Sequence, residues 1–160
     1  VGGLPIRGPD MVAARLSDEG GKAVLAGSHD GYLQRFGLMH FRRIELSQNG
    51  DAIDGIERLE PPQGSLRLKA DLPYAIHFHL HPDCRCERLP GREGCRITVN
   101  DGQIWKFTAD GADMTIEDGL YFVDSAGPRP ALQIVLRGAT FGQSEVRWRV
   151  TLSPPAETGQ

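Results

Sequence analysis

Three of the chain's five histidines, His77, His79 and His81, alternate with apolar residues in the segment Ile-His-Phe-His-Leu-His-Pro. In a β-strand successive side chains point to opposite faces, so this spacing predicts three imidazoles on one face and an apolar core side on the other. Same-face neighbours lie about 6.5–7 Å apart, which lets two imidazoles converge on one metal ion. His79 and His81 are therefore a candidate metal-ligand pair. The alternative is a strand with one polar side.

A metal site on this strand would need further ligands from another strand. His29 and His40 are the other imidazoles of the chain, and Asp83 is a nearby carboxylate. No second motif with ligand spacing completes the set.

A second group of reactive side chains occupies the segment Ser-His-Asp-Gly-Tyr-Leu-Gln-Arg-Phe-Gly, residues 28–37. His29 and Tyr32 are side chains that can act as acid and base, and Arg35 can pair with a carboxylate. No nucleophile motif accompanies them. Taken alone, the segment is typical of a hairpin with polar residues.

The cysteines Cys84, Cys86 and Cys95 surround a Leu-Pro-Gly-Arg-Glu-Gly segment that resembles a hairpin loop. This pattern leaves open whether Cys95 forms a disulfide with Cys84 or Cys86. The odd count favours a reducing compartment, and the spacing lacks the repeated Cys-x-x-Cys of a zinc ribbon. We interpret the three as plain thiols that pack as small apolar side chains.

The elements that must position these residues are predicted to be strands. The chain holds 20 glycines and 11 prolines, well above a background of roughly 12% for the pair, and they are spread as turn signals. Strand-like runs between the turns cover residues 22–29, 38–47, 64–72, 74–81, 95–101, 103–110, 114–123, 131–138 and 145–152. Residues 8–20 are the best helix candidate and could equally form a strand. The predicted fold class is all-β, an antiparallel sandwich or barrel.

Length, charge and hydropathy argue against several classes of protein. At 160 residues the chain is about one domain, which we place at residues 1–152, with 153–160 as a frayed tail. The net charge of −3 without a basic stripe argues against a nucleic-acid partner. No run approaches the roughly 18 apolar residues of a membrane span. Because the chain opens on Val1 without Met, we expect a fragment or processed product of a longer protein.

Four segments, in order, carry a resemblance: SHDGYLQRFGLMHFRRIELS, YAIHFHLHP, IWKF and PRPALQIVLRG. Together they resemble the C-terminal domain of the heparinase II/III family of polysaccharide lyases, over roughly residues 26–140. The resemblance implies a multi-stranded antiparallel β-sandwich that forms part of a larger lyase β domain. It also implies a missing partner, an N-terminal helical toroid.

The resemblance implies cleavage of uronic-acid polysaccharides by β-elimination, with most catalytic residues in the toroid. This chain alone is therefore expected to be non-catalytic, with an acidic polysaccharide as the ligand of the whole protein. Tyr32, with His29 beside it, is the position that the resemblance places at the substrate cleft. No cofactor is expected in this chain. Some members hold zinc in the sandwich, so zinc at His79 and His81 stays open. The resemblance itself implies that the pair His79/His81 is structural or lies between domains.

Two functions of other classes remain as alternatives: a free-standing carbohydrate-binding module and a small metal-dependent enzyme built on the histidine strand. The first would expose aromatic platforms, and only 7% of the residues are aromatic. The second would hold a stoichiometric metal. A homodimer is also open, since unpaired sheet edges favour pairing with another chain. The polysaccharide and the compartment, periplasmic or cytoplasmic, are not fixed by the sequence.

Overall fold

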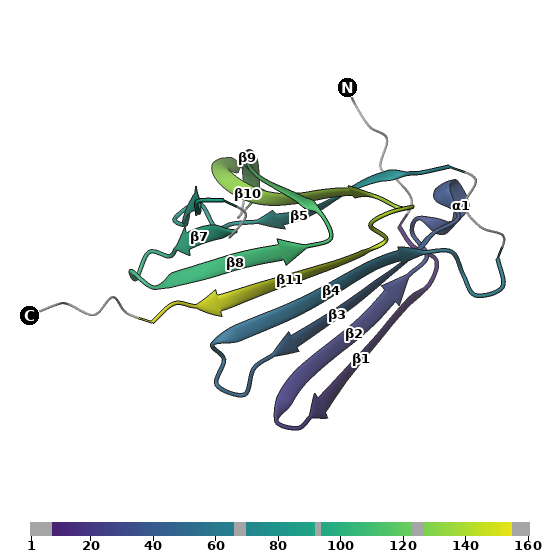
Figure 1. The fold of residues 1–160 in the computed structure, drawn as a ribbon, viewed down its shortest axis with the longest axis horizontal. Coiled ribbons are helices and arrows are strands. Elements are labelled where there is room, and N and C mark those ends of the chain that lie inside the picture. Colours follow the sequence, from purple (N-terminus) through teal and green to yellow (C-terminus); the bar gives the residue numbers. More distant parts are fainter. Residues whose placement is uncertain (1–7, 66–69, 92–93, 123–126, 155–160) are drawn as a thin grey trace, which may run out of the picture.

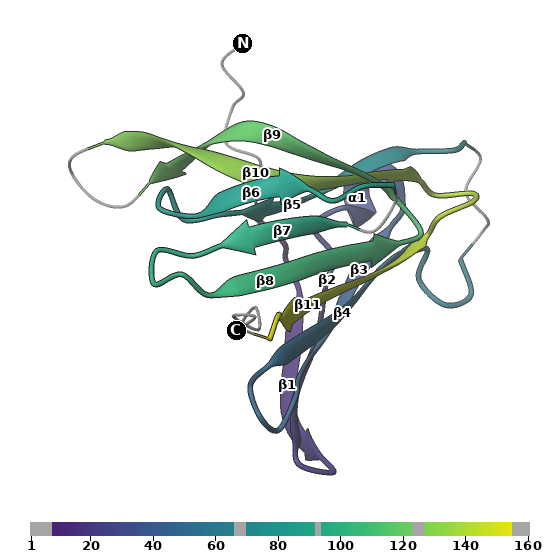
Figure 2. The same cartoon turned by 60° about the vertical axis from the view of Figure 1, so that its left-hand side comes forward.

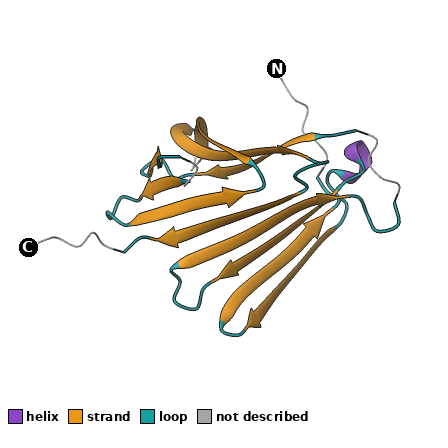
Figure 3. Cartoon of the chain, in the orientation of Figure 1, coloured by secondary structure: helices purple, strands orange, loops and turns teal. Residues whose placement is uncertain are grey.

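The computed structural model describes residues 8–65, 70–91, 94–122 and 127–154, which form an antiparallel β-sandwich (Figures 1 and 3). The predicted fold class is confirmed. Within these ranges the strands and the single short helix are β1 (Val12–Glu19), β2 (Lys22–His29), α1 (Leu33–Phe36), β3 (Met39–Leu46), β4 (Ala52–Glu60), β5 (Pro73–His79), β6 (Arg85–Arg88), β7 (Cys95–Thr98), β8 (Ile104–Asp110), β9 (Asp113–Phe122), β10 (Pro128–Ala139) and β11 (Glu145–Leu152).

The two sheets differ in size. Sheet A has eight strands in the order β1-β2-β3-β4-β11-β8-β7-β6, and sheet B has three in the order β5-β10-β9. Sheet B lies over the β11-to-β6 part of sheet A, with β9 in contact with β6, while β1–β3 extend beyond it (Figure 2). One part of sheet A is therefore a covered sandwich layer, and the other part is covered by no described strand.

The core lies between the two sheets, where large apolar side chains meet. Phe107 of β8 and Trp148 of β11 point toward sheet B, and the Phe78 ring of β5 lies 5.0 and 5.1 Å from them, centroid to centroid. Ile134 and Leu136 of β10 are fully buried in the same cluster. The predicted apolar side of the histidine strand is confirmed, because Ile76, Phe78 and Leu80 all pack against this core.

Most predicted strands match an observed one, and residues 22–29 and 145–152 match β2 and β11 in full. Residues 8–20, left open between helix and strand, contain strand β1. The strand predicted at residues 64–72 is wrong at the positions that the structure describes, because residues 64–65 and 70–72 form no strand. Residues 66–69 lie outside the described residues. The domain boundary at 152 and the tail stay predictions, since 155–160 also lie outside.

The strand β4 was not predicted, although it lies in the middle of sheet A. Its inward-facing positions hold Ile53, Gly55, Glu57 and Leu59. A glycine and a carboxylate in the middle of that row break the alternation of apolar and polar residues by which a strand is recognised. Both exceptions have a structural cause.

Gly55 is required because the indole of Trp148 occupies the space above it. A Cβ atom at position 55 would lie 2.0 Å from Trp148 Cε2 and 2.1 Å from Cζ2. The two residues are direct cross-strand partners, so their side chains share the inner face of sheet A. The missing side chain of Gly55 thus creates the slot in which the Trp148 ring lies flat against β4.

We predict that Gly55→Ala destabilises the chain by about 1–3 kcal/mol, because the added methyl group forces the Trp148 ring out of its slot. Urea unfolding followed by tryptophan fluorescence measures the loss. Gly142→Ala is the control, since a Cβ there meets no atom within 4 Å. Equal stability of the two variants would contradict the packing argument.

Candidate functional site

The candidate site is built around the carboxylate of Glu57, which is only 2% exposed. Its oxygens accept hydrogen bonds from His40 Nε2 at 2.7 Å, from Arg42 Nε at 2.7 and 2.9 Å, and from Trp148 Nε1 at 3.1 Å. A buried carboxylate is costly unless its lone pairs are satisfied, and here both oxygens receive two donors.

The register of sheet A brings these side chains together. Arg42 of β3 is the direct cross-strand partner of Glu57 on β4, and His40 is paired with Leu59, two residues further along. His29 of β2 is in turn the partner of His40. With Trp148 of β11, the residues project from the same face of four adjacent strands, so an arrangement spanning residues 29 to 148 in sequence is local in space.

The hydrogen bonds fix the tautomers of both imidazoles. Gly31 N–H donates to His29 Nδ1 at 3.2 Å, so the proton of neutral His29 lies on Nε2. That atom is 3.0 Å from His40 Nδ1, which therefore accepts and leaves the His40 proton on Nε2, facing Glu57. One chain of hydrogen bonds runs from the Gly31 backbone through the imidazoles of His29 and His40 to the buried carboxylate.

The same contacts set the ionisation of the site. Burial alone would raise the pKa of Glu57, but the hydrogen bond from His40, the charge of Arg42 and the bond from Trp148 outweigh it and lower the pKa below 4.5. The pKa of His29 is lowered from 6.5, first by burial and then by the neighbouring His40. An ionised Glu57 and a neutral His29 are thus the states that the fold favours.

The chain of hydrogen bonds holds the segment that carries Tyr32. Tyr32 is the N-cap residue of α1, and its ring centroid lies 5.4 Å from that of His29 and 6.3 Å from that of His40. The helix ends at Gly37, whose φ of 71° is the left-handed conformation that favours glycine. Tyr32 remains 44% exposed. The structure brings the two predicted contact residues, His29 and Tyr32, together at one end of the sandwich; their role stays a prediction.

A groove of about 380 Å³ runs from Tyr32 along the step between the two sheets. Its floor comes from sheet A and includes His40, Arg42 and Leu59. Its wall is β5, along the edge that does not pair with β10, and Phe36 of α1 closes one end. The lining residues are Tyr32, Phe36, Leu38, His40, Arg42, Leu59, Leu72, Pro73, Tyr74, Ala75, Ile76, His77 and Thr140.

The histidine strand presents its imidazoles on the outer face of sheet B. His77 and His79 have parallel rings 6.1 Å apart, and His77 Nδ1 lies 3.0 Å from Gln133 Oε1. His81 follows the strand and packs on Tyr121 instead. Among the described residues there is no group of three or more His, Cys, Asp or Glu side chains that could hold a metal ion. The His79/His81 metal pair stays a prediction.

The three cysteines are free thiols. The predicted hairpin is present as β6 and β7, and Cys95 lies across from Arg88 rather than from another cysteine. Cys84 and Cys86 pack against the core in which Cys95 is buried. A hydrogen bond between Cys86 and Cys95 lowers the pKa of the Cys86 thiol and, together with burial, raises that of Cys95. These contacts agree with the interpretation of the cysteines as packing residues.

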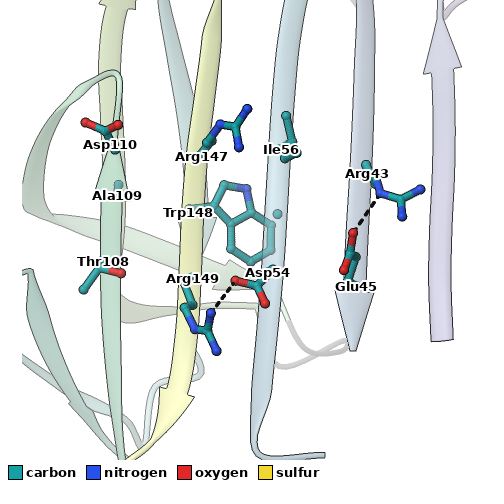
Figure 4. Close-up of a pocket in the computed structure, with 11 residues that line it drawn as sticks. Arg43, Glu45, Asp54, Ile56, Thr108, Ala109, Asp110, Arg147, Trp148 and Arg149 are labelled. Atoms are coloured by element: carbon teal, nitrogen blue, oxygen red, sulfur yellow. Dashed lines mark hydrogen bonds and ion pairs between the residues drawn. The ribbon is translucent and has the colours of Figure 1, made fainter. Parts of the chain in front are cut away.

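A second hollow, of about 520 Å³, lies over β3, β4, β11 and β8 (Figure 4). Figure 4 shows the Trp148 ring between β11 and β4, with Arg147 and Arg149 on β11 and Arg43 on β3. Because side chains alternate along each strand, these arginines project from the face of sheet A opposite to the ring. Two of them are paired within the hollow, Arg149 with Asp54 at 3.2 Å and Arg43 with Glu45 at 2.9 Å. Arg147 is 2.7 Å from Glu145. Each arginine of this hollow therefore already has a carboxylate partner.

Sequence reasoning missed Glu57 and Arg42, the two residues on which the site depends. Glu57 was hidden because β4 was not recognised as a strand. The available signal was the cross-strand spacing of three segments, His29, His40–Arg42 and Glu57, which becomes visible only once β2, β3 and β4 are aligned.

Comparison with known proteins identifies the family. Residues 5–149 match the family described as "Heparinase II/III-like, C-terminal". The chain therefore belongs to this family, and the resemblance drawn from the motifs is confirmed. Within the described residues no helix is long and apolar enough to cross a membrane.

Individual relatives add detail. The chain is 30% identical over 152 residues to FtsZ-localized protein C of Caulobacter vibrioides, covering 91% of this chain and 26% of that protein. Heparan sulfate lyase HepC from Pedobacter heparinus shares the fold with a TM-score of 0.72 and 13% identity, over 93% of this chain and 23% of the lyase. The heparinase III BT4657 gene product shares the fold with a TM-score of 0.66 and 14% sequence identity, over 90% of this chain and 21% of that protein. The chain thus spans about a quarter of the length of each.

We predict that Glu57→Gln lowers the free energy of unfolding by about 2–3 kcal/mol. Both oxygens of Glu57 accept N–H donors, so either orientation of the amide places its NH₂ group against another donor. Chemical denaturation measures the change. Glu87→Gln is the control because Glu87 forms a largely exposed ion pair, at 4.0 Å from Arg96. A Glu57→Gln variant as stable as this control would refute the central role of the carboxylate.

We predict that the chain loses stability as pH falls through about 6.5, and that His29→Asn flattens this loss. The folded pKa of His29 lies below its unfolded value of 6.5, so below that pH the unfolded state binds the extra proton and is favoured. Unfolding free energies between about pH 7.5 and 5.5 test this, because the Glu57 contribution is lost only below about 4.5. A His29→Asn variant that keeps the original slope would contradict the assignment of the loss to His29.

Proposed function

We propose that the chain is the C-terminal β-sandwich of a heparinase II/III-like protein that cleaves uronic-acid polysaccharide by β-elimination, and that it supports the substrate cleft without being catalytic. The proposal draws support from the family match over residues 5–149 and from two lyases of the same fold. The N-terminal helical toroid is the proposed partner that supplies the catalytic residues.

The observation that carries the proposal is the anchoring of Tyr32 at one end of the sandwich. The hydrogen bonds that run from Gly31 through His29 and His40 to Glu57 hold the segment around Tyr32 in place. An exposed aromatic ring on a rigid support suits a sugar ring, since the flat apolar face of a pyranose packs against it. Arg35 in the last turn of α1 is an exposed cation close by, suited to a uronate carboxylate.

The same geometry argues that neither His29 nor His40 is the acid or base of an elimination. β-Elimination needs a base for the proton α to the carboxylate, groups that neutralise that carboxylate, and an acid for the leaving oxygen. Both ring nitrogens of His29 and of His40 are engaged in the hydrogen-bond chain. Neither imidazole has a nitrogen left to exchange a proton with a substrate. Their task in this proposal is to position Tyr32.

A second candidate function rests on the 30% identity to FtsZ-localized protein C, which is higher than the 13–14% identity to the lyases. In that case the sandwich belongs to a protein that localises with FtsZ, and the domain serves that localisation rather than polysaccharide cleavage. Co-sedimentation of the purified chain with FtsZ polymers, without affinity for a uronate polymer, would favour this function over the first.

We predict that Tyr32→Ala weakens binding of the chain to heparan sulfate or alginate by about 3- to 10-fold, the usual contribution of one stacked aromatic ring. Calorimetric titration gives the affinities, and the ultraviolet absorbance of unsaturated uronates reports elimination. The chain alone should yield none, and its production at an efficient rate would overturn the non-catalytic role. Phe122→Ala is the control, since Phe122 is 75% exposed on sheet B. Equal losses in the two variants would remove Tyr32 from the contact surface.

A further inference from the structure

The outer face of sheet B, on the far side from the core, carries two neighbouring imidazoles. Side chains alternate along β5, so Ile76 and Phe78 pack into the core while His77 and His79 are exposed on the other side. The two rings are nearly parallel, with an interplanar angle of 16° and 6.1 Å between their centroids. Imidazole nitrogens are common ligands of zinc and of other late transition metals, so this pair is a candidate for shared coordination.

The amide of Gln133 determines which nitrogen of His77 carries the proton. Gln133 Nε2 donates a hydrogen bond to the carbonyl oxygen of Asp118 at 3.1 Å, so its Oε1 is the atom that lies 3.0 Å from His77 Nδ1. An amide oxygen can only accept, and His77 therefore has its proton on Nδ1 and its lone pair on Nε2. A Cβ atom at Gly119 would lie 3.3 Å from Gln133 Cδ, so the absence of a side chain there lets the amide lie against β9.

This is the arrangement that a metal-binding histidine requires. A ligating imidazole typically donates its other N–H group to an oxygen acceptor, which fixes the tautomer, orients the ring and makes the ligating nitrogen more basic. His77 has such an acceptor in Gln133, and its Nε2 is left for a ligand. The imidazoles of His29 and His40 differ, because both of their nitrogens are already engaged.

The third histidine of the segment has the opposite tautomer. The backbone N–H of Asp83 donates to His81 Nδ1 at 3.3 Å, so the lone pair of His81 is engaged and its proton lies on Nε2. Its ring packs edge-on against Tyr121, with 5.1 Å between the centroids. The His79 ring, in contrast, is stacked on His77 and forms no hydrogen bond to a described residue. The geometry therefore favours His77 over His81 as the partner of His79.

We propose that His77 and His79 together bind one late first-row divalent metal ion, such as Zn²⁺, through His77 Nε2 and one nitrogen of His79. Bonds of about 2.0–2.1 Å in a tetrahedral arrangement place the two nitrogens roughly 3.3 Å apart. The exposed His79 side chain turns about χ1 and χ2 to reach this position. Gln133 is a positioning residue that acts through His77. The site lies outside the Glu57 network and does not depend on the proposed polysaccharide contact at Tyr32.

Calorimetric titration of the chain with Zn²⁺ and with Ni²⁺ tests the proposal. One ion should bind per chain, and His77→Asn and His79→Asn should each lower the affinity at least about 10-fold, since even the loss of a supporting partner has an effect of this size. His81→Asn is the matched control, exposed on the same segment, and should bind as the unchanged chain does. Because all three side chains are exposed, unchanged circular dichroism should accompany each substitution.

Three outcomes of the titration would overturn the proposal. The first is an unchanged affinity in His77→Asn or in His79→Asn. The second is a loss in His81→Asn as large as that in His77→Asn, which would assign the ion to the whole histidine segment. The third is binding that survives both substitutions and disappears when the thiols are alkylated, which would assign the ion to the cysteines.

Nitrogen-15 NMR of the imidazoles tests the role of Gln133 separately. In the metal-free chain the His77 spectrum should show the proton on Nδ1, and Zn²⁺ should shift the Nε2 resonance. Gln133→Leu removes the acceptor, so it should bring His77 to a mixture of both tautomers and weaken Zn²⁺ binding by about 10-fold. A His77 proton on Nε2 in the unchanged chain would contradict the proposal, as would a Gln133→Leu variant with unaltered tautomer and affinity.

Discussion

The carboxylate of Glu57 is the constraint on which much of this sandwich depends. It lies in the middle of the larger sheet, where only paired charge is tolerated, and it receives donors from β3 and β11 on either side of β4. One acceptor thus links three adjacent strands across their side chains, in addition to the backbone ladder. Through His40 and His29 the same carboxylate fixes the segment that presents Tyr32, so the core and the exposed end of the molecule share one hydrogen-bond network.

Gly55 and Trp148 belong to the same arrangement. The indole can donate to Glu57 only because its ring lies flat over β4, and it lies flat only because residue 55 has no side chain. The aromatic cluster with Phe78 and Phe107 then packs on the other side of the ring and joins sheet B to sheet A. Glycine and glutamate, two residue types that disfavour a central strand, are here the condition for its packing.

This explains how far the sequence could predict the structure. The alternation of apolar and polar residues predicted the fold class, β2 and β11 in full, and the core side of the histidine strand. It failed at β4, where the inward row contains Gly55 and Glu57. The predicted residues His29 and Tyr32 do lie together, but the partners that hold them come from β3, β4 and β11. Their proximity follows from strand order and register, which short-range patterns do not contain.

Sheet B covers only part of the larger sheet A, and this decides which side chains on the inner face of sheet A are buried. One cross-strand row on the inner face of sheet A runs from Leu16 and Leu25 through Ile44 and Gly55 to Trp148. Beneath sheet B this row is core and the Glu57 carboxylate is buried, whereas beyond sheet B Leu25 and Leu16 are 43% and 74% exposed. Each of these two exposed leucines leaves unrealised roughly 1 kcal/mol of the burial free energy that its side chain could contribute. The Glu57 network lies next to the boundary between the two halves, with Arg42 half in the groove. Arg42, which binds the buried carboxylate and also lines the groove, therefore lies where the covering by sheet B ends.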